Sequence, residues 1–518
     1  MIEQVLTKLS VLGMVPLLGS IFPLPNSILL AQNVTPTVPA IKRPSNSVTA
    51  LVEQANAKRE QNKLPEAIRL YRQAIAIDPV FVPAHYGLGV ALRQQGNLEG
   101  AIASHRRAIQ IDSTYTPAYY GLGIALYKKG DMAGAANAYN MVIKQSKTDA
   151  SLAPTYYNLG LAEEGRGNLK AAIAAFRQAI ALDRNYALAH SGLGSVLRRQ
   201  GDPKGAIAAF REAVKIAPNN ITAQYALGVA LYEQKDYAGA IAAYKQAAAL
   251  DDKFPNLHYN LGIALSAEGN NNTEAIAAYQ RATELDTRND NAYTALGNAL
   301  LQEGRPAEAI TAFRRSVVIN PKSFSAYNGL GLALRRDGKL EEAIAAYQQA
   351  IQLSPNYAAA YNNLGRALSD QNKLTEAIAA FRKAVEVDPK NGVAYSNLGN
   401  LLRAQGNPIG AIEALNRAIL LGKDELWVDY TSLALVQAEQ GSMKEALEAY
   451  NKAIALNPDF PNAHFGLGAL YAAQGETQMA IASYKEALRL YQAANSTEWV
   501  SRTQQALQAL QSTPQSQQ

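Results

Sequence analysis

Apolar residues recur at intervals of three and four residues through most of the chain, which is the spacing of one face of an α-helix. They form short amphipathic runs that come in pairs, and a turn with Gly or Asn separates the two runs of a pair, as at Gln95-Gly96-Asn97. Proline follows the second run in six pairs, at Pro79, Pro218, Pro321, Pro355, Pro389 and Pro458. Because proline cannot continue a helix, it separates one pair from the next. The pattern predicts an all-α chain built of paired helices.

A short phrase around one glycine recurs at a nearly constant distance. It occurs as GLGVAL, NLGLAE, ALGNAL and related forms, with its glycine at Gly89, Gly123, Gly160, Gly194, Gly228, Gly262, Gly297, Gly331, Gly365, Gly399 and Gly468. The usual gap is 34 residues, and Ala434 fills the same place in one segment. A period of this length is the signature of a repeat architecture. It predicts thirteen repeats over residues 48–494, which begin at Val48, Val82, Thr116, Ala153, Ala187, Ile221, Pro255, Asp290, Phe324, Ala358, Gly392, Trp427 and Pro461.

Two positions of the second run are nearly constant. Alanine occupies one of them in all thirteen repeats, from Ala67 to Ala480, and Tyr or Phe stands four residues later in eleven. His105 and Leu415 are the exceptions. A small residue where helices touch, next to one ring that fills the adjoining gap, gives the alternation that close packing requires. These positions predict the core of each repeat.

Together these features resemble the tetratricopeptide repeat family, whose units are helix-turn-helix hairpins. The resemblance implies a right-handed superhelical solenoid of about thirteen such units, closed by a C-terminal capping helix. The family's usual Trp near the start of the first helix is Tyr or His in this chain. The first repeat departs most, with Gln54, Ala55 and Lys58 at places where other repeats carry apolar residues or Gly. A more polar first repeat suits the end of an array.

The start of the chain does not follow the repeat. Residues 1–31 combine Lys8 with an apolar stretch at 9–22 and a Leu-Leu-Ala sequence that ends at Ala31, which is the pattern of an export signal cleaved after Ala31. The interpretation places the protein in the periplasm or cell envelope. A membrane anchor that is not cleaved and a cytoplasmic protein with an unusual N-terminus remain alternatives. Pro16 interrupts the apolar stretch and disfavours a membrane helix, so we expect no membrane span in the mature chain.

The segments that flank the array are polar. Residues 32–47 are rich in Pro, Ser and Thr without periodicity, and they predict a disordered tether. Residues 495–511 carry apolar residues at helical spacing in a stretch rich in Gln and Ser. They predict a helix that covers the last repeat, whose apolar face would otherwise be exposed. Residues 512–518 predict a disordered tail.

Composition and charge exclude several classes of function. The 518 residues include no Cys, which rules out disulfide scaffolds, thiolate metal sites and Cys nucleophiles. There are 49 Lys and Arg against 43 Asp and Glu, mixed along the chain, and the net charge is +6. Without an isolated basic block, this balance argues against a nucleic-acid partner.

The histidines and glycines give no sign of catalysis. His85, His190, His258 and His464 stand where other repeats carry Tyr, and His105 stands in the ring position of the second helix. They are spread one to a repeat, whereas metal ligands must converge. The glycine phrases lie inside a helix rather than in a loop after a strand, so they are not phosphate loops. We expect no metal, no cofactor and no enzymatic activity.

The family resemblance implies that the first helices line a concave groove. Residues two, five, six, nine, twelve and thirteen of each repeat share that face. In the first half it carries Tyr86, Tyr120, Tyr157, Tyr225 and Tyr259. In the second half it carries Asn298, Asn328, Asn362, Asn363, Asn397 and Asn400 with Arg335, Arg366 and Arg403. Tyr offers contact area, Asn binds peptide backbones and Arg binds carboxylates. Whether the Tyr rings instead pack on neighbouring helices is left open.

These residues predict a non-enzymatic scaffold that binds extended or helical peptide segments of other proteins in its groove, to assemble a multiprotein complex. Asn at the sixth residue of a repeat, at Asn158, Asn260, Asn363 and Asn397, is similar to the asparagine ladder of O-linked sugar transferases. That resemblance implies an alternative, the accessory recruiting arm of a separate glycosyltransferase or polysaccharide-export system. An assembly factor for photosystems or pigment-proteins is a further alternative. The sequence leaves the partner and the oligomeric state open.

Overall fold

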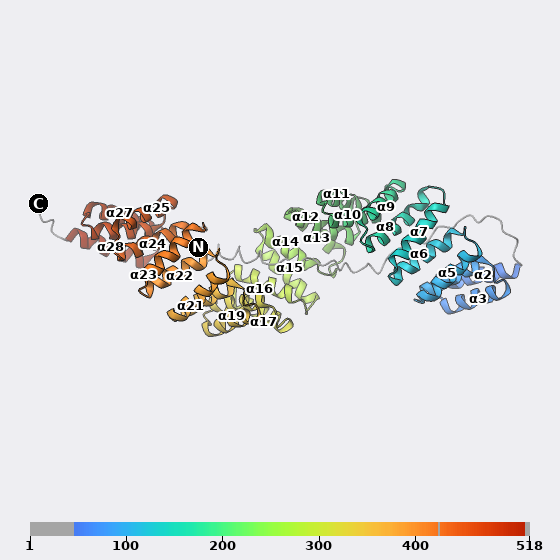
Figure 1. The fold of residues 1–518 in the computed structure, drawn as a ribbon, viewed down its shortest axis with the longest axis horizontal. Coiled ribbons are helices and arrows are strands. Elements are labelled where there is room, and N and C mark those ends of the chain that lie inside the picture. The colour runs from blue at the N-terminus through green and yellow to red at the C-terminus, as the bar shows by residue number, and fades with distance from the viewer. Residues whose placement is uncertain (1–45, 423–424, 513–518) are drawn as a thin grey trace. The chain divides into compact units, whose positions relative to one another are not determined.

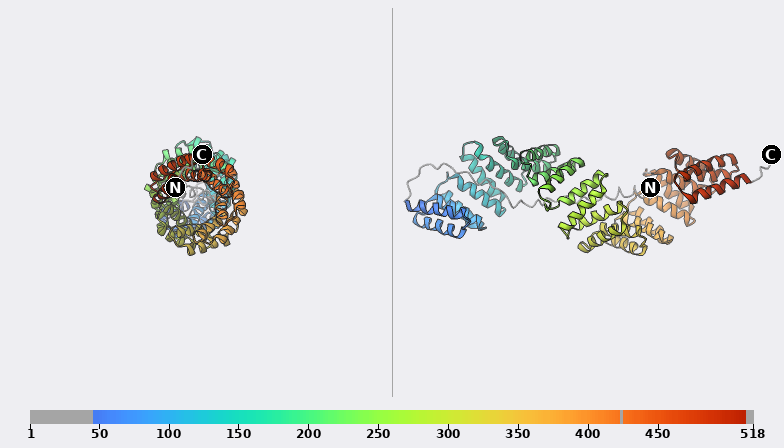
Figure 2. Two further views of the ribbon diagram at one scale, coloured as in Figure 1. Left: turned by 90° about the vertical axis from the view of Figure 1, so that its left-hand side faces the viewer. Right: turned by 180° about the vertical axis from the view of Figure 1, so that it is seen from behind.

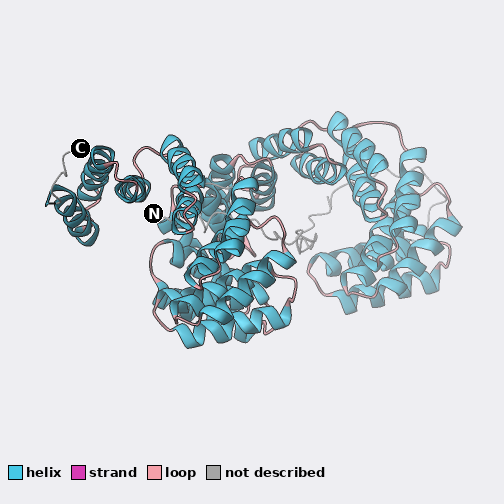
Figure 3. Ribbon diagram, turned by 60° about the vertical axis from the view of Figure 1, so that its left-hand side comes forward, coloured by secondary structure: helices cyan, strands magenta, loops and turns pink. Residues whose placement is uncertain are grey.

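The computed structural model describes residues 46–422 and 425–512. In this part of the chain the regular structure is entirely helical, with 27 α-helices, one 3₁₀ turn and no strand (Figures 1 and 3). The predicted export signal at 1–31, nearly all of the tether and nearly all of the tail lie outside the described residues. The predicted all-α class is confirmed.

The helices alternate as the first and second members of thirteen pairs. The first helices are α2 (Asn46–Glu60), α4 (Val82–Gln94), α6 (Thr116–Lys129), α8 (Ala153–Gly165), α10 (Ala187–Gln200), α12 (Ile221–Glu233), α14 (Leu257–Glu268), α16 (Asp290–Gln302), α18 (Phe324–Arg336), α20 (Ala358–Asp370), α22 (Gly392–Ala404), α24 (Leu426–Glu439) and α26 (Pro461–Ala473). The second helices are α3 (Leu64–Ile77), α5 (Leu98–Ile111), α7 (Met132–Gln145), α9 (Leu169–Leu182), α11 (Pro203–Ile216), α13 (Tyr237–Leu250), α15 (Asn272–Leu285), α17 (Pro306–Ile319), α19 (Leu340–Leu353), α21 (Leu374–Val387), α23 (Pro408–Leu420), α25 (Met443–Leu456) and α27 (Thr477–Ala493). The predicted helix-turn-helix array is thereby confirmed.

The chain forms two compact units, residues 1–278 and residues 279–518, and the division falls within α15. From α2 to α14 each helix packs on the next, and the same holds from α16 to α28 (Thr497–Ser512), so the pairs stack in chain order within each unit (Figure 2). First helices of neighbouring repeats also contact each other, as α4 contacts α6 and α18 contacts α20. Among the described residues, no two neighbouring second helices contact each other as closely as these first helices do. The first helices therefore lie on the more closely packed side of each unit.

Local chemistry explains the turn inside each hairpin. The turn requires a residue with left-handed backbone, and glycine fills this place in most repeats, as Gly96 does with a φ of 90°. Asn62, with a φ of 58°, takes the same conformation in the first repeat, because Asn tolerates it better than other side chains. In several repeats an Asn or Asp then caps the second helix. The Asp131 carboxylate, for example, accepts a hydrogen bond from the Gly134 backbone amide at 2.8 Å.

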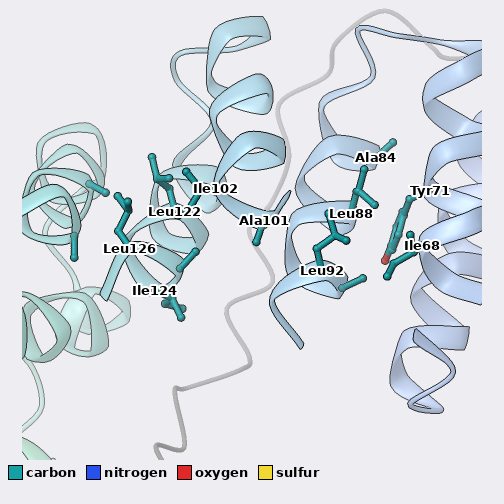
Figure 4. Close-up of a cluster of buried hydrophobic side chains, with 14 of the residues drawn as sticks. Ile68, Tyr71, Ala84, Leu88, Leu92, Ala101, Ile102, Leu122, Ile124 and Leu126 are labelled. Atoms are coloured by element: carbon teal, nitrogen blue, oxygen red, sulfur yellow. The ribbon is translucent and has the colours of Figure 1, made fainter. Parts of the chain in front are cut away.

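The core follows the two constant positions of the second helix. The thirteen alanines from Ala67 to Ala480 are all 0% exposed, and the side chains of the ring position are at most 5% exposed. Figure 4 shows part of this core, in which Tyr71 of α3 faces Ala84 and Leu88 of α4. The sequence pattern therefore identified the buried positions correctly.

Each ring lies against glycines of the first helices. A Cβ placed on Gly160 of α8 would lie 2.6 Å from Cε1 of Phe176, and so would a Cβ on Gly192 of α10. Phe176 of α9 is thus held between its own first helix and the next one. His105 lies between Gly89 and Gly121 in the same manner. At these two steps both glycines are needed because one ring occupies the space in which two Cβ atoms would stand. Where the following repeat carries Asn158 or Ala226 at the second position, the ring meets a glycine of its own first helix alone.

The predicted terminal helix is α28 (Thr497–Ser512), which packs on α27. Its Trp499 stacks on Tyr491 with ring centroids 5.4 Å apart and meets Phe465 of α26 edge-on at 5.3 Å. The hydroxyl of the fully buried Thr503 donates to the Trp499 carbonyl at 2.6 Å. The helix therefore covers rings of the last repeat with rings of its own.

Replacing Gly192 with Ala should destabilise the N-terminal unit. The added methyl group would overlap Phe176, and overpacking costs about 1–3 kcal/mol, which outweighs the gain of about 1 kcal/mol in helix propensity. Gly165→Ala is the matched control, because its Cβ would meet only the flexible side chain of Met132, at 2.9 Å. Hydrogen exchange of the α9 and α10 amides measures the effect. Equal protection in both variants would contradict the proposed role of the glycine.

Candidate functional site

All five candidate tyrosines lie on first helices, and each is half-buried. The Tyr86 ring lies 5.7 Å from His105 of its own repeat and 5.8 Å from Tyr115, which precedes the next first helix. Tyr225 contacts Tyr244 and Phe254 in the same two directions, at 5.8 and 5.2 Å. The rings therefore do pack on neighbouring segments, the possibility that the sequence left open, while part of their surface remains accessible.

Burial keeps these phenols neutral. It raises the pKa of Tyr120 and of Tyr225 to about 12, and it also raises the pKa of Tyr86 and of Tyr157. Each hydroxyl is therefore available as both a hydrogen-bond donor and an acceptor at neutral pH.

The sixth-residue asparagines link neighbouring repeats through a set of bonds that we call the amide rungs. In each rung the Asn Nδ2 donates to the fifth residue of the preceding repeat. The rungs are Asn158 to the Tyr120 hydroxyl (3.0 Å), Asn260 to the Tyr225 hydroxyl (2.6 Å), Asn363 to Asn328 Oδ1 (3.0 Å) and Asn397 to Asn362 Oδ1 (3.1 Å). The sequence identified these residues but not that they bond to one another.

A second set of bonds, the charged rungs, joins the twelfth residue of one repeat to the thirteenth residue of the next. They are Glu164 with Arg199 (2.9 Å), Arg198 with Glu233 (2.6 Å), Arg335 with Asp370 (2.6 Å) and Arg403 with Glu439 (2.8 Å). Arg336 is also a thirteenth residue, and it donates to the backbone carbonyl of Leu301, the twelfth residue of the preceding repeat, at 2.6 Å. Opposite charges 35 or 36 residues apart were the sequence signal for this set, and the predicted site residues included only Arg335 and Arg403.

The other candidates also lie on first helices. Asn298 of α16 is exposed, whereas Asn400 of α22 and Arg366 of α20 are half-buried. Together with both sets of rungs, the candidate residues occupy one side of the first helices, which we call the first-helix face. Its side chains are held by their neighbours in the adjoining repeats, so much of the face is organised before a ligand arrives.

The four histidines other than His105 fasten the linkers between repeats. The Nε2 atoms of His85, His190, His258 and His464 each lie 2.8 to 3.0 Å from the backbone carbonyl oxygen six residues earlier. Each histidine thus ties the start of a first helix to the end of the preceding second helix. Among residues 46–422 and 425–512, no group of His, Asp and Glu side chains has the arrangement of a metal site.

Comparison with known families identifies the repeat. Family models described as tetratricopeptide repeat or TPR repeat together match residues 52–153, 157–221, 230–413 and 434–494. The chain belongs to the tetratricopeptide repeat (TPR) family. Membership of this TPR family supports a role as a protein-interaction scaffold.

The TPR chain is also similar to solved structures, although no curated protein matches it. One is the APC/C hetero-tetramer Cut9-Hcn1, with 15% identity over 88% of this chain and 96% of that chain and a TM-score of 0.40. Another is YrrB, described as a TPR protein with an unusual peptide-binding site, with 22% identity over 39% of this chain and all of that chain (100%), and a TM-score of 0.34. MamA shows 28% identity over 32% and 95% of the two chains and a TM-score of 0.30.

His105 is the most unusual titratable group of this TPR array. It is 0% exposed, and neither ring nitrogen has a hydrogen-bond partner. Burial, helped by the positive charge of Arg93, lowers its pKa to about 3. The ring is therefore neutral at physiological pH, and it fills the position that Tyr or Phe fills in most other repeats.

His105→Phe should stabilise the second and third repeats by about 1–3 kcal/mol at pH 7, because it removes two buried polar atoms that lack partners. The stabilisation by His105→Phe relative to the wild type should grow by up to about 2 kcal/mol when the pH is lowered to 5. The unfolded imidazole binds a proton below about pH 6.5 and the folded one does not, so acid lowers the stability of the wild type only. Hydrogen exchange of the α4, α5 and α6 amides at both pH values measures this. A variant no more protected than the wild type at either pH would contradict it.

Proposed function

We propose that this TPR chain is a non-enzymatic scaffold that binds peptide segments of partner proteins along its first-helix face and so assembles a multiprotein complex. One observation carries the proposal. Tyr rings, amides and guanidinium groups in the N-terminal unit, and amides and guanidinium groups in the C-terminal unit, lie on the same side of successive first helices and in the same register. A surface that repeats its chemistry at each helix suits an extended or helical peptide that runs across several helices.

The rungs leave hydrogen-bonding capacity for a ligand. An Asn side chain has two N–H donors, and the half-buried Asn363 and Asn397 each use one of them in a rung. The same side chains can therefore link repeats and bind the backbone of a peptide. Because the rungs already fix their rotamers, little side-chain entropy is lost on binding.

The amide rungs of the C-terminal unit favour a second candidate. Asn363 and Asn397 bond to Asn328 and Asn362, which gives consecutive asparagine pairs along α18, α20 and α22. This arrangement is similar to the asparagine ladder of sugar transferases that present protein substrates. An accessory arm that recruits substrates for a separate glycosyltransferase or polysaccharide-export system would use the same face.

Photo-crosslinking tests which face partners occupy. A benzophenone amino acid at Gln94 of α4 or Asn298 of α16, both exposed on the first-helix face, should crosslink to partner proteins in the native host. The same amino acid at Arg177 of α9 or Arg315 of α17, both exposed on second helices, is the control and should crosslink at least tenfold less. Immunoblotting for adducts of the full chain measures the difference.

The crosslinking positions are exposed, so changing them avoids a problem that substitution of the tyrosines would raise. Truncating Tyr225 would also remove its ring contacts and its rung to Asn260, so a loss of binding could reflect unfolding. Adducts of equal yield from both faces, or adducts from the second helices alone, would contradict the proposed binding face.

We also propose that the protein is exported. The support is the sequence of residues 1–31, which lie outside the described residues. Within the described ranges, no helix combines the length and the apolar character that crossing a membrane requires. Mass spectrometry of the protein from its host should find a mature chain that starts at Gln32. A chain that retains Met1 would contradict cleavage and export by this signal.

A further inference from the structure

The second helix α23 carries two large apolar side chains on its solvent side. Ile409 is 81% exposed and Leu420 is 73% exposed, and among the described residues no other large hydrophobic side chain is as exposed as these two. They are the second and the last residue of α23, and the distance between them along the chain makes about three helical turns. Both side chains therefore project from the same side of the helix, which packs on α22 and α24 with its other sides.

The other second helices do not carry this pair. At the two equivalent positions they have Lys, Arg, Glu, Gln, Thr, Ala or Pro, as at Thr375 and Glu386 of α21, and Val318 of α17 is the exception. An isolated apolar residue on a surface is ordinary, whereas two in line on one helix mark a contact. Because the array forms without these side chains everywhere else, that contact lies outside the array.

The polar residues between the two apolar ones complete a pattern. Glu413 lies one helical turn after Ile409. Asn416 lies one turn before Leu420, and Arg417 follows it. These three polar side chains are exposed, and within the described ranges neither Glu413 nor Arg417 has an ion-pair partner. The order along the helix is thus apolar, acidic, amide with basic, and apolar, and we call these five residues the α23 stripe.

We propose that the α23 stripe binds the α23 stripe of a second copy of this chain, with the two helices antiparallel about a two-fold axis. In such a self-complementary contact Ile409 of one copy meets Leu420 of the other at both ends. Near the axis, Glu413 of one copy lies opposite Asn416 and beside Arg417 of the other, so an amide donor and a cation face the carboxylate. A parallel pair would set Glu413 against Glu413. Charge complementarity therefore selects the antiparallel arrangement.

The size of the α23 stripe sets the strength of the contact. One helix pair buries less surface than the roughly 1,200–2,000 Å² of stable protein complexes, so we expect a dimer with a Kd on the order of 10 μM. Because α23 is a second helix, the dimer leaves the first-helix face of both copies accessible. The dimer then holds two binding faces together, which raises the avidity for a partner that offers two peptide segments. The inference goes beyond the proposed function and does not depend on it.

Sedimentation velocity of the purified full chain, from about 1 to 100 μM, tests for the dimer. The wild type should shift from monomer to dimer across this range. Leu420→Lys places a charge in both apolar contacts and should raise the Kd at least tenfold, and Ile409→Lys should do the same from the other end of the helix. Val318→Lys is the matched control, because Val318 is 68% exposed at the equivalent position of α17. It should leave the Kd unchanged.

Disulfide trapping tests the direction of the pair. The chain has no Cys, so a Glu413→Cys chain and an Asn416→Cys chain each carry one thiol. In the antiparallel pair these two positions face each other across the axis, and a disulfide joins residues whose Cα atoms lie about 4.4–6.8 Å apart. When the two variants are mixed, with a size tag on one of them, oxidation should give mainly the mixed disulfide. Adding Leu420→Lys to both chains should lower its yield at least fivefold.

Three results would overturn the inference. They are a wild type that stays monomeric at about 100 μM, a dimer whose Kd neither Leu420→Lys nor Ile409→Lys changes, and disulfides that join like variants in preference to unlike ones. A monomeric wild type that retains another host protein, which Leu420→Lys does not retain, would assign the α23 stripe to a different partner. Because the first-helix face takes no part in these measurements, their failure leaves the proposed function intact.

Discussion

The fold depends on one large buried side chain per repeat, a ring in all repeats but one, that packs against the first helices. Phe176 illustrates the constraint, because Gly160 of its own repeat and Gly192 of the next lie where any larger residue would overlap it. The ring sets how closely consecutive first helices approach, and the buried alanine four residues earlier sets how closely the second helix approaches them. Since the buried alanine and the large side chain recur in every hairpin, the stack propagates from one repeat to the next.

The close approach of the first helices produces the chemistry of their face. It brings the fifth residue of one repeat next to the sixth of the following one, and the twelfth next to the thirteenth. Amide rungs such as Asn260 to Tyr225 and charged rungs such as Arg335 to Asp370 are the result. Such partly exposed pairs add little stability one by one, about 0–1 kcal/mol each. Their larger effect is to hold polar side chains in fixed positions on the side where a peptide would bind.

Most of the fold could be predicted from the sequence because every signal is repeated thirteen times. Starts of first helices such as Val82, Thr116 and Phe324 were placed to the residue, and the buried alanines and rings were identified. The partners of the polar residues were not identified, because a pairing across repeats depends on how two hairpins are offset. That offset is one residue more than the period, as Arg198 and Glu233 show, and periodicity alone does not reveal it.

The most direct test of the account is a crystal structure of the full chain bound to a peptide selected for it. The account predicts a peptide that runs across several first helices on the first-helix face. A peptide bound to the outer side of the second helices would contradict the central claim that the face created by the packing of the first helices is the one that receives partners.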